Sequence, residues 1–375
     1  MSRKNLFVPG EPAPWFSANC LGNPQFAFHS VAGRYIVLCF FESMARPDSE
    51  RIVRDFLNYQ QAFDDENACF FGVSTDPEDE RLGRARDSVP GVRFFWDFDR
   101  AASRLYGAVT GENGSEAFRP HTLLLDERLR VLAAVPFQPS PETHAARIMD
   151  FLKRLPPIGP PRLATIQAPV LVVPRLFEPK LCQTLIRYYE ERGGQESGFM
   201  QEKDGRTVSV YDHEFKRRRD QEIADEELRK ACMVRIHDRL VPEIHKAFQF
   251  RATRIERYIV ACYDATSGGH FRPHRDNTTK GTAHRRFAVS LNLNTGEYEG
   301  GSLRFPEFGP QLYVPPAGGA VVFSCSLLHE ATPVTAGKRY AFLPFLYDDE
   351  AARIRAANLG FLGEGPAPES VGQTS

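Results

Sequence analysis

Residues 318–347 read GGAVVFSCSLLHEATPVTAGKRYAFLPFLY, a succession of apolar strand-like runs divided by short turns. Four similar runs, with no helical segment between them, stand between Arg254 and this stretch: RYIVACY, RRFAVSLNLN, GGSLRF and QLYVP. Many short strands joined by Gly, Pro and Asn turns are typical of a sandwich or jelly roll. Residues 254–347 therefore predict an antiparallel β fold.

Two segments ahead of these strands predict helices. They are KLCQTLIRYYEERGG, residues 180–194, and DEELRKACMVRIHDRLVPEIHKAF, residues 225–248. Both mix polar and apolar residues as surface helices do. The second half of the chain is therefore expected to be a jelly roll with flanking helices.

A boundary is expected in LPPIGPPRLATIQAP, residues 155–169, because its prolines cannot continue a helix or a central strand. A chain of 375 residues is long enough for two domains. We expect a first domain over 1–155, a Pro-rich linker over 156–168, a second domain over 169–350, and a tail over 351–375. The polar end of the tail, GEGPAPESVGQTS, predicts partial disorder.

The first domain predicts an α/β fold. Its apolar runs YIVLCFF (35–41), ACFFGVST (68–75) and HTLLLD (121–126) are short and continuous. A helical pattern, SERIVRDFLNYQQAF (49–63), lies between the first two. Strands that helices cover on both faces have this pattern.

Composition limits the partners and the compartment. A net charge of −1 gives no field toward nucleic acid or an anionic membrane, so neither partner is expected. The 7 cysteines are scattered without a CxxC pair and indicate buried thiols in a reducing compartment. No apolar run has the length of a signal peptide or membrane span. The interpretation is a cytoplasmic protein, with the oligomeric state left open.

The stretch HFRPHRDNTT, residues 270–279, carries the candidate metal ligands. On a strand, His274 and Asp276 lie two residues apart and share a face. His329 follows the apolar strand GGAVVFSC and can return to the same mouth. Two histidines and one carboxylate form the facial triad of non-haem Fe(II) oxygenases. His270 and His284 lack the ligand spacing and are interpreted as solvent-facing or lid residues.

Arg339, on the strand KRYAFLPFLY, supports iron over zinc. A guanidinium that points into a barrel needs an anion, and its planar fork suits a carboxylate. A dicarboxylate that chelates iron and reaches Arg339 is 2-oxoglutarate. The phenol of Tyr263 is either a core group or a further contact to this co-substrate, and the adjacent Lys338 should face the other way.

These segments together resemble the prolyl 4-hydroxylase-like Fe(II)/2-oxoglutarate dioxygenases: CYDATSGGHFRPHRDN, RRFAVSLNLN, GGSLRFPE and HEATPVTAGKRYAF. The resemblance covers roughly residues 165–350. It implies a double-stranded β-helix, iron ligands at His274, Asp276 and His329, and a 2-oxoglutarate anchor at Arg339. It also implies Fe(II), 2-oxoglutarate and O2, with ascorbate as a candidate reductant.

The basic run KRRRD, residues 216–220, has two interpretations. Such a run is usually a solvated face. Alternatively, it and the loop RDNTTKGTAHRR (275–286) edge the mouth of the site and favour an acidic or extended polypeptide substrate.

The first domain resembles the peroxiredoxin and thioredoxin-fold family over about residues 5–155. The resemblance is carried by PGEPAPWF, GRYIVLCFFESMARPDSERIVRDF and FRPHTLLLD. On this match the peroxidatic cysteine falls on Ser49, Pro47 is retained, and Pro120 takes the place of the family's cis-proline. Peroxiredoxin chemistry needs a thiolate at the helix start, which serine cannot supply.

The predicted function is a two-domain enzyme, a degenerate thioredoxin-like module followed by a 2-oxoglutarate-dependent dioxygenase. It is expected to hydroxylate a small molecule or a polypeptide, with a prolyl or other protein side chain among the candidates. One alternative is a thiol peroxidase with an accessory barrel, which Ser49 opposes. The other is a non-catalytic binding or sensor protein.

Overall fold

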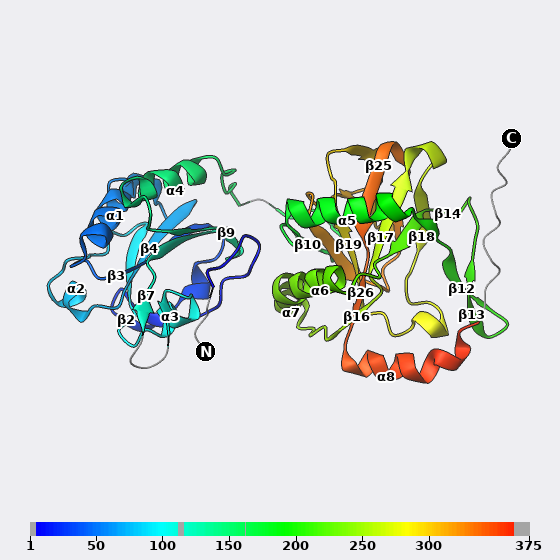
Figure 1. Ribbon diagram of the computed structural model, residues 1–375, viewed down its shortest axis with the longest axis horizontal. Helices are drawn as coiled ribbons and strands as arrows, with labels where there is room; N and C mark the ends of the chain where they lie inside the picture. The colour runs from blue at the N-terminus through cyan, green and yellow to red at the C-terminus, as the bar shows by residue number, and fades with distance from the viewer. Residues whose placement is uncertain (1–4, 112–115, 162, 364–375) are drawn as a thin grey trace. The chain divides into compact units, whose positions relative to one another are not determined.

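The computed structural model describes residues 5–111, 116–161 and 163–363. The chain divides into two compact units, Met1–Arg162 and Leu163–Ser375, within the proline-rich segment (Figure 1). None of the helices in the described ranges is both long and apolar enough to cross a membrane.

A mixed seven-stranded sheet forms the centre of the first unit. Its strand order is β2-β1-β5-β4-β3-β8-β9, and the neighbours β3, β4 and β5 run parallel. The bounds are β1 Ser17–Cys20, β2 Asn23–Ala27, β3 Tyr35–Glu42, β4 Ala68–Ser74, β5 Val92–Trp96, β8 His121–Leu125 and β9 Val131–Pro136. A two-stranded ribbon is made of β6 Val109–Thr110 and β7 Ala117–Phe118.

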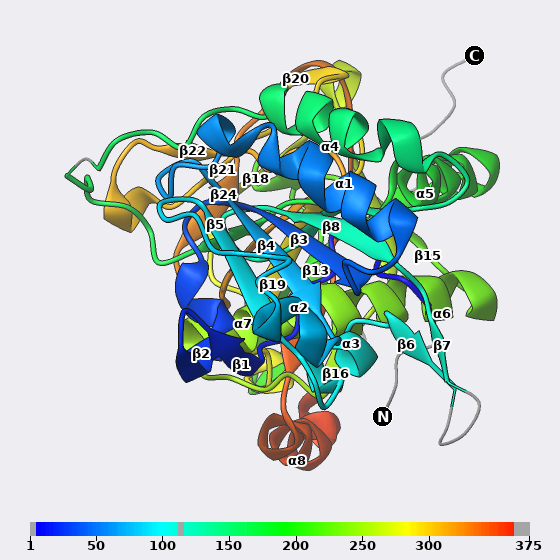
Figure 2. The same cartoon turned by 90° about the vertical axis from the view of Figure 1, so that its left-hand side faces the viewer.

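Alternation along β3 divides the core of this unit into two layers. Val37, Cys39 and Phe41 pack against α1 and α4, which lie side by side on one face of the sheet (Figure 2). Ile36, Leu38 and Phe40 belong to the cluster on the other face. The helices are α1 Pro47–Leu57, α2 Pro77–Arg81, α3 Ala101–Leu105 and α4 His144–Lys153. The α/β prediction is confirmed.

Two antiparallel sheets make the second unit, as the jelly-roll prediction requires. The ten-stranded sheet has the path β10-β23-β19-β25-β17-β15-β11, joined by β16, β20 and β26. Its bounds are β10 Leu171–Val173, β11 Gln195–Glu196, β15 Arg219–Glu222, β16 Arg254–Glu256, β17 Ile259–Asp264, β19 Phe287–Asn292, β20 Tyr298–Gly300, β23 Ala320–Ser324, β25 Val334–Phe342 and β26 Phe345–Tyr347. The five-stranded sheet contains β14 Lys216–Arg217, β18 His270–His274, β24 His329–Ala331, β21 Leu303–Arg304 and β22 Leu312–Tyr313.

Three helices cover the outer face of the ten-stranded sheet. They are α5 Pro179–Arg192, α6 Glu226–Arg235 and α7 Val241–Phe248, with a π-helical turn at Ile236–Leu240 between the last two. Tyr340 and Phe342 of β25 pack outward against this layer, so Arg339 and Ala341 face inward. Both helical segments expected from the sequence are present.

A separate hairpin rises beside the sheets and was not expected. It consists of β12 Phe199–Lys203 and β13 Arg206–Val210, joined by a turn with positive φ at Asp204 and Gly205. Thr207 attaches the hairpin near its turn, because its Oγ1 accepts from Gly281 N at 2.8 Å and its carbonyl accepts from Gly363 N at 3.0 Å.

The end of the chain differs in part from the prediction. Helix α8, Asp349–Asn358, continues past the expected domain end at residue 350, followed by the turn Leu359–Phe361. Asp348 caps α8 by accepting from Ala351 N, and Ala351 is fully buried, so the start of the expected tail is packed. The predicted disorder concerns 363–375, of which all but Gly363 lie outside the described residues.

Pro120 corrects a further expectation. The cis peptide bonds of the described residues precede Pro90 and Pro139, so Pro120 does not occupy a cis bond. Just before β8, Arg119 N donates to Ala108 O at 2.6 Å, and Pro120 O accepts from Phe137 N at 3.2 Å.

Candidate metal centre and co-substrate pocket

The side chains of His274, Asp276 and His329 converge where β18 ends and its partner β24 begins. Strand β18 pairs with β24 so that His274 lies opposite His329. Asp276 follows β18, and its backbone N donates to Cys325 O at 3.0 Å. One ligand atom from each of the three side chains lies within 4.8 Å of the others. In the described part of the chain, no second group of three His, Cys, Asp or Glu side chains meets the same condition.

The histidine rings are held in the tautomer that a metal requires. His274 Nδ1 lies 2.7 Å from Arg272 O, and His329 Nδ1 lies 3.0 Å from Leu327 O. A ring that donates from Nδ1 presents the lone pair of Nε2. Both Nε2 atoms face Asp276, at 3.7 Å from its Oδ1 for His274 and 3.4 Å from its Oδ2 for His329.

The protonation states also suit a cation. Burial is the main cause that lowers the pKa of His274, to about 3, so the ring is neutral at ordinary pH. Burial raises the pKa of Asp276, but the neighbouring histidines and Arg285 outweigh it, so the carboxyl stays ionised. Within the described residues, no hydrogen bond ends on its carboxylate oxygens. A buried, bare carboxylate between two imidazole lone pairs fits a divalent cation.

Arg339 lies inside the same cavity. It is 2% exposed, and its Nη2 donates to Ser290 Oγ and Asn292 Oδ1, both at 2.8 Å. None of the carboxylates of the described residues pairs with it. Its neighbour Lys338 faces outward, with a 53% exposed side chain 3.5 Å from Asp264. This difference follows from the alternation of a strand.

Tyr263 lies beneath two guanidinium groups. It is 3% exposed, and its ring centroid is 5.2 Å from the guanidinium carbon of Arg339 and 5.7 Å from that of Arg218. Arg218 Nη1 donates to its hydroxyl at 3.4 Å. Tyr263 is thus a buried phenol that also lines the cavity.

The network below Asp276 was missed by sequence analysis. Glu256 accepts from Arg285 at 2.6 Å and contacts His284 Nε2 at 2.7 Å. Arg285 Nη1 also donates to the carbonyl of Asp276 at 3.4 Å. His284 is 2% exposed, so its interpretation as solvent-facing is wrong. Its ring is buried because it contacts the carboxylate of Glu256. Adjacent basic residues at 284–286 were the available signal.

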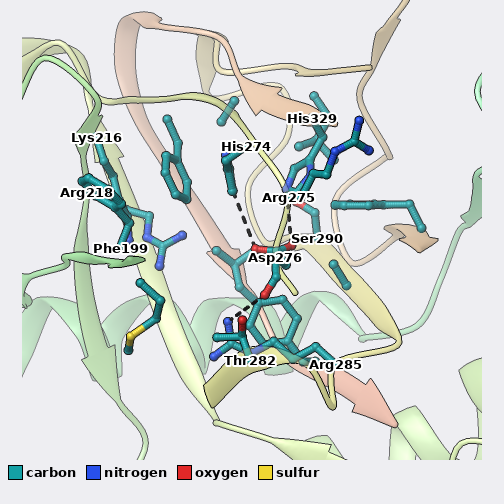
Figure 3. Close-up of a pocket in the computed structure, with 18 of the residues that line it drawn as sticks. Phe199, Lys216, Arg218, His274, Arg275, Asp276, Thr282, Arg285, Ser290 and His329 are labelled. Atoms are coloured by element: carbon teal, nitrogen blue, oxygen red, sulfur yellow. Dashed lines mark hydrogen bonds and ion pairs between the residues drawn. The ribbon is translucent and has the colours of Figure 1, made fainter. Parts of the chain in front are cut away.

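The cavity around these groups has a volume of about 320 Å³ (Figure 3). Figure 3 shows His274, Asp276 and His329 pointing toward one another, with Lys216 and Arg218 on a facing wall. Of the basic run 216–220, Lys216 is 5% and Arg218 is 6% exposed, and both line the cavity. These two side chains are therefore not part of a solvated face.

In the first unit, the residue at the family's peroxidatic position in the first turn of α1 is buried. Ser49 is 1% exposed, and its hydroxyl donates to Phe41 O at 2.6 Å. All 7 cysteines are buried and free. Burial raises the pKa of Cys20, Cys39 and Cys69 to about 12, so none is a thiolate at ordinary pH. Ser49 therefore leaves the start of α1 without the thiolate that the thiol peroxidase alternative requires.

Family models match both units. The 2OG-Fe(II) oxygenase superfamily matches residues 253–347, and the AhpC/TSA family matches residues 9–134. A PKHD-type hydroxylase of Pseudomonas fluorescens is 40% identical over 91 residues, 22% of this chain and 39% of that protein. A PKHD-type hydroxylase of Synechococcus is 33% identical over 97 residues, 24% of this chain and 42% of that protein. The chain thus spans about two fifths of the length of these relatives.

Two solved structures are each similar to a part of the chain. A prolyl-4-hydroxylase of Pseudomonas putida is 20% identical, with a TM-score of 0.38, over 48% of this chain and 94% of that one. The bacterioferritin comigratory protein of Xanthomonas campestris is 21% identical, with a TM-score of 0.33, over 41% of this chain and 98% of that one.

Proposed function

We propose that the second unit is an Fe(II)- and 2-oxoglutarate-dependent dioxygenase that hydroxylates an organic substrate. Residues 253–347 match the 2OG-Fe(II) oxygenase superfamily, and residues 9–134 match the AhpC/TSA family. The observation that carries the proposal is the meeting of three ligand atoms within 4.8 Å in the cavity that Arg339 lines.

His274, Asp276 and His329 would hold the iron. Their carbonyl-bound Nδ1 atoms fix both rings, and the ionised carboxylate offsets part of the metal charge. When bound, Fe(II) with 2-oxoglutarate supplies the activation of O2 that hydroxylation requires. Ascorbate is the proposed reductant that keeps the metal in the ferrous state.

Arg339 would anchor the distal carboxylate of 2-oxoglutarate. Ser290 and Asn292 hold its guanidinium in place, so little side-chain entropy remains to be lost on binding. Tyr263, whose ring lies near this guanidinium, is the proposed second contact. The low exposure of Arg339 strengthens a charge-assisted bond by excluding water.

The proposed substrate is a prolyl or other protein side chain, or a small molecule that enters the same cavity. The first unit serves as a docking or stabilising module, because Ser49 stands where a peroxidase needs cysteine. This assignment leaves the chemistry to the second unit alone.

Turnover tests the proposal. The purified chain with Fe(II), 2-oxoglutarate, O2 and whole cell extract should form succinate and products heavier by one oxygen atom. His274→Ala should form neither, whereas His270→Ala should retain both, because His270 bonds only Gly268 and Glu214 carbonyls. A chain that binds 2-oxoglutarate tightly but never forms succinate would instead be the non-catalytic sensor.

A further inference from the structure

Cations exceed carboxylates along the cavity of the second unit. Six basic side chains line it, and three have carboxylate partners: Arg218 with Asp220, Arg275 with Glu307, and Arg285 with Glu256. Lys216, Arg257 and Arg339 form no ion pair with any described residue. The proposed function assigns Arg339 to 2-oxoglutarate. Lys216 and Arg257 therefore remain without an ion-pair partner, although the carboxylate of Asp220 lies near enough to act on both charges.

Arg257 is held in place at the junction of β16 and β17. Its φ of 54° is left-handed, a conformation that is uncommon outside glycine. Nε donates to Leu343 O at 3.0 Å, and the guanidinium carbon lies 4.3 Å from the Phe345 ring centroid. Its Nη atoms donate in none of the hydrogen bonds of the described residues. Two parallel donors are thus free for a carboxylate.

Lys216 is a second cation on the cavity wall. It is 5% exposed, and its Nζ donates to Ser197 Oγ at 2.8 Å and to Gly198 O at 2.5 Å. An ammonium has three donors, so one remains. Burial lowers the pKa of Lys216 well below its ordinary value, and Arg218 and Arg257 lower it further against the opposing effect of Asp220. An anion between these two side chains would relieve both effects.

The wall beside Lys216 is aromatic. Lys216 Nζ lies 4.8 Å from the Phe271 ring centroid, and the Phe215 ring lies 5.7 Å from Phe271 and 4.5 Å from Phe199. These rings line the cavity together with the unpaired cations. The surface therefore suits a molecule with an apolar body and one acidic group.

We propose that Arg257, assisted by Lys216, forms a second anion subsite that binds a carboxylate of the primary substrate. The substrate class is an organic acid or a peptide with an acidic side chain. The assignment rests on the proposed function, because only a 2-oxoglutarate at Arg339 reserves the remaining cations for the substrate.

Ligand-induced stabilisation of the full-length chain tests the subsite without turnover. The protein is held under argon with Fe(II) and saturating 2-oxoglutarate, and its unfolding temperature is followed against N-acetylglutamate methylamide, the uncharged N-acetylglutamine methylamide and an end-blocked peptide with one glutamate. A ligand that binds only the native state raises this temperature by an amount that grows with its concentration relative to its dissociation constant. The acid or the acidic peptide should stabilise the protein, and the neutral amide should not.

Arg257→Gln should raise the half-saturating concentration of the acid by about tenfold to a hundredfold, as loss of a charged hydrogen bond does. Arg257→Lys should recover part of the loss. Arg254→Gln is the matched control, since Arg254 pairs with Asp349 outside the cavity and should behave as the unmodified chain. Unfolding temperatures without ligand identify any variant that fails to fold.

The outcomes are distinct. Stabilisation by the free acid alone indicates a small-molecule substrate, and stabilisation by the peptide indicates a protein side chain; both support the subsite. Equal effects of acid and amide, an acid effect that survives Arg257→Gln, or stabilisation by inorganic phosphate alone would overturn it. If 2-oxoglutarate itself gives no stabilisation, the proposed function fails, whereas the response to N-acetylglutamate methylamide still reports on the subsite.

Discussion

The start of α1 in the first unit and the cavity of the second unit treat polar groups in opposite ways. At α1, the chain satisfies its own groups: Ser49 donates to Phe41 O, and Met44 N donates to Asp79 Oδ2 at 2.9 Å. In the cavity, Asp276 lacks a donor to its carboxylate and Arg339 lacks a carboxylate, within the described residues. Polar groups whose hydrogen bonds are satisfied within the protein have a structural role. Polar groups that are held in place but lack a partner are available to a ligand.

The largest expected effect is on the metal centre. The protein with Fe(II) and 2-oxoglutarate under argon should show a weak visible charge-transfer band. His274→Ala and Asp276→Ala should abolish the band, because two ligands do not make the facial triad. Removing the metal with a chelator should have the same effect.

The control for this measurement is His270→Ala, on the same strand. Its ring is engaged by backbone carbonyls and should be irrelevant to the band. An unchanged band in either ligand variant would remove that residue from the set.

Arg339 should give the next largest effect. Arg339→Ala should weaken 2-oxoglutarate binding by about 2 to 5 kcal/mol, because it removes a buried charge-assisted contact. Fe(II) binding should change far less. Titration of the charge-transfer band measures both affinities.

Lys338→Ala is the matched control on the neighbouring position of β25. Its exposed ammonium should contribute little to co-substrate binding. A larger effect of Lys338→Ala than of Arg339→Ala would contradict the inward orientation proposed for the anchor.

Acid should lower the stability of the native state by protonating Asp220, the partner of Arg218. Burial raises the pKa of Asp220, but Arg218 and Lys216 outweigh it and hold the value at about 2. Since an unfolded aspartate titrates near about 3.9, the ionised carboxylate stabilises the native state above that pH, and this contribution is lost as the pH falls toward 2. The loss should be on the order of 2 kcal/mol.

Hydrogen exchange of the β15 amides at several pH values measures this loss. Asp220→Asn should start less stable, because Arg218 is left unpaired, and should then lack the acid-dependent decline. Glu222→Gln, at an exposed position of the same strand, should decline as the unmodified chain does. If the stability of all three proteins declined equally as the pH fell, the assignment of this decline to Asp220 would be contradicted.

The last prediction is that the protein has no peroxidase activity. The full-length chain with hydrogen peroxide and a thiol reductant should not consume peroxide at an enzyme-like rate, because its thiols in the first unit have a pKa of about 12. Iodoacetamide should alkylate the native protein much more slowly than the unfolded one. Peroxide consumption that disappears in Cys20→Ser, Cys39→Ser or Cys69→Ser would show that the first unit also has a reactive site, which would contradict this comparison.

Much of the second unit was predictable because it depends on short-range patterns. Apolar runs separated by turns predicted the strands, and the two-residue period separated Arg339 from Lys338. The spacing of His274 and Asp276 placed them near one another before any tertiary information. The ionic network was not predictable: Glu256, His284 and Arg285 meet through contacts between distant segments.

The residues that sequence analysis missed share one property. Arg257 stands beside Glu256 at the start of the run RYIVACY, and nothing in that local sequence indicates that it lines the cavity. The hairpin of residues 199–210 is largely exposed, so it has little apolar periodicity to reveal it. Pro120 resembled a family position, but its backbone is set by the local pairing of Arg119. Tertiary context decided all three.

The hairpin also bears on how this protein can diversify. Phe199 and Met200 line the cavity, whereas Gln201, Glu202 and Lys203 are exposed, and Thr207 attaches the hairpin near its turn. Neither the proposed metal ligands nor the proposed anchor at Arg339 lies on the hairpin. Preference for a ligand can therefore evolve, or be engineered, by exchanging the two cavity-lining residues Phe199 and Met200 while those positions stay constant.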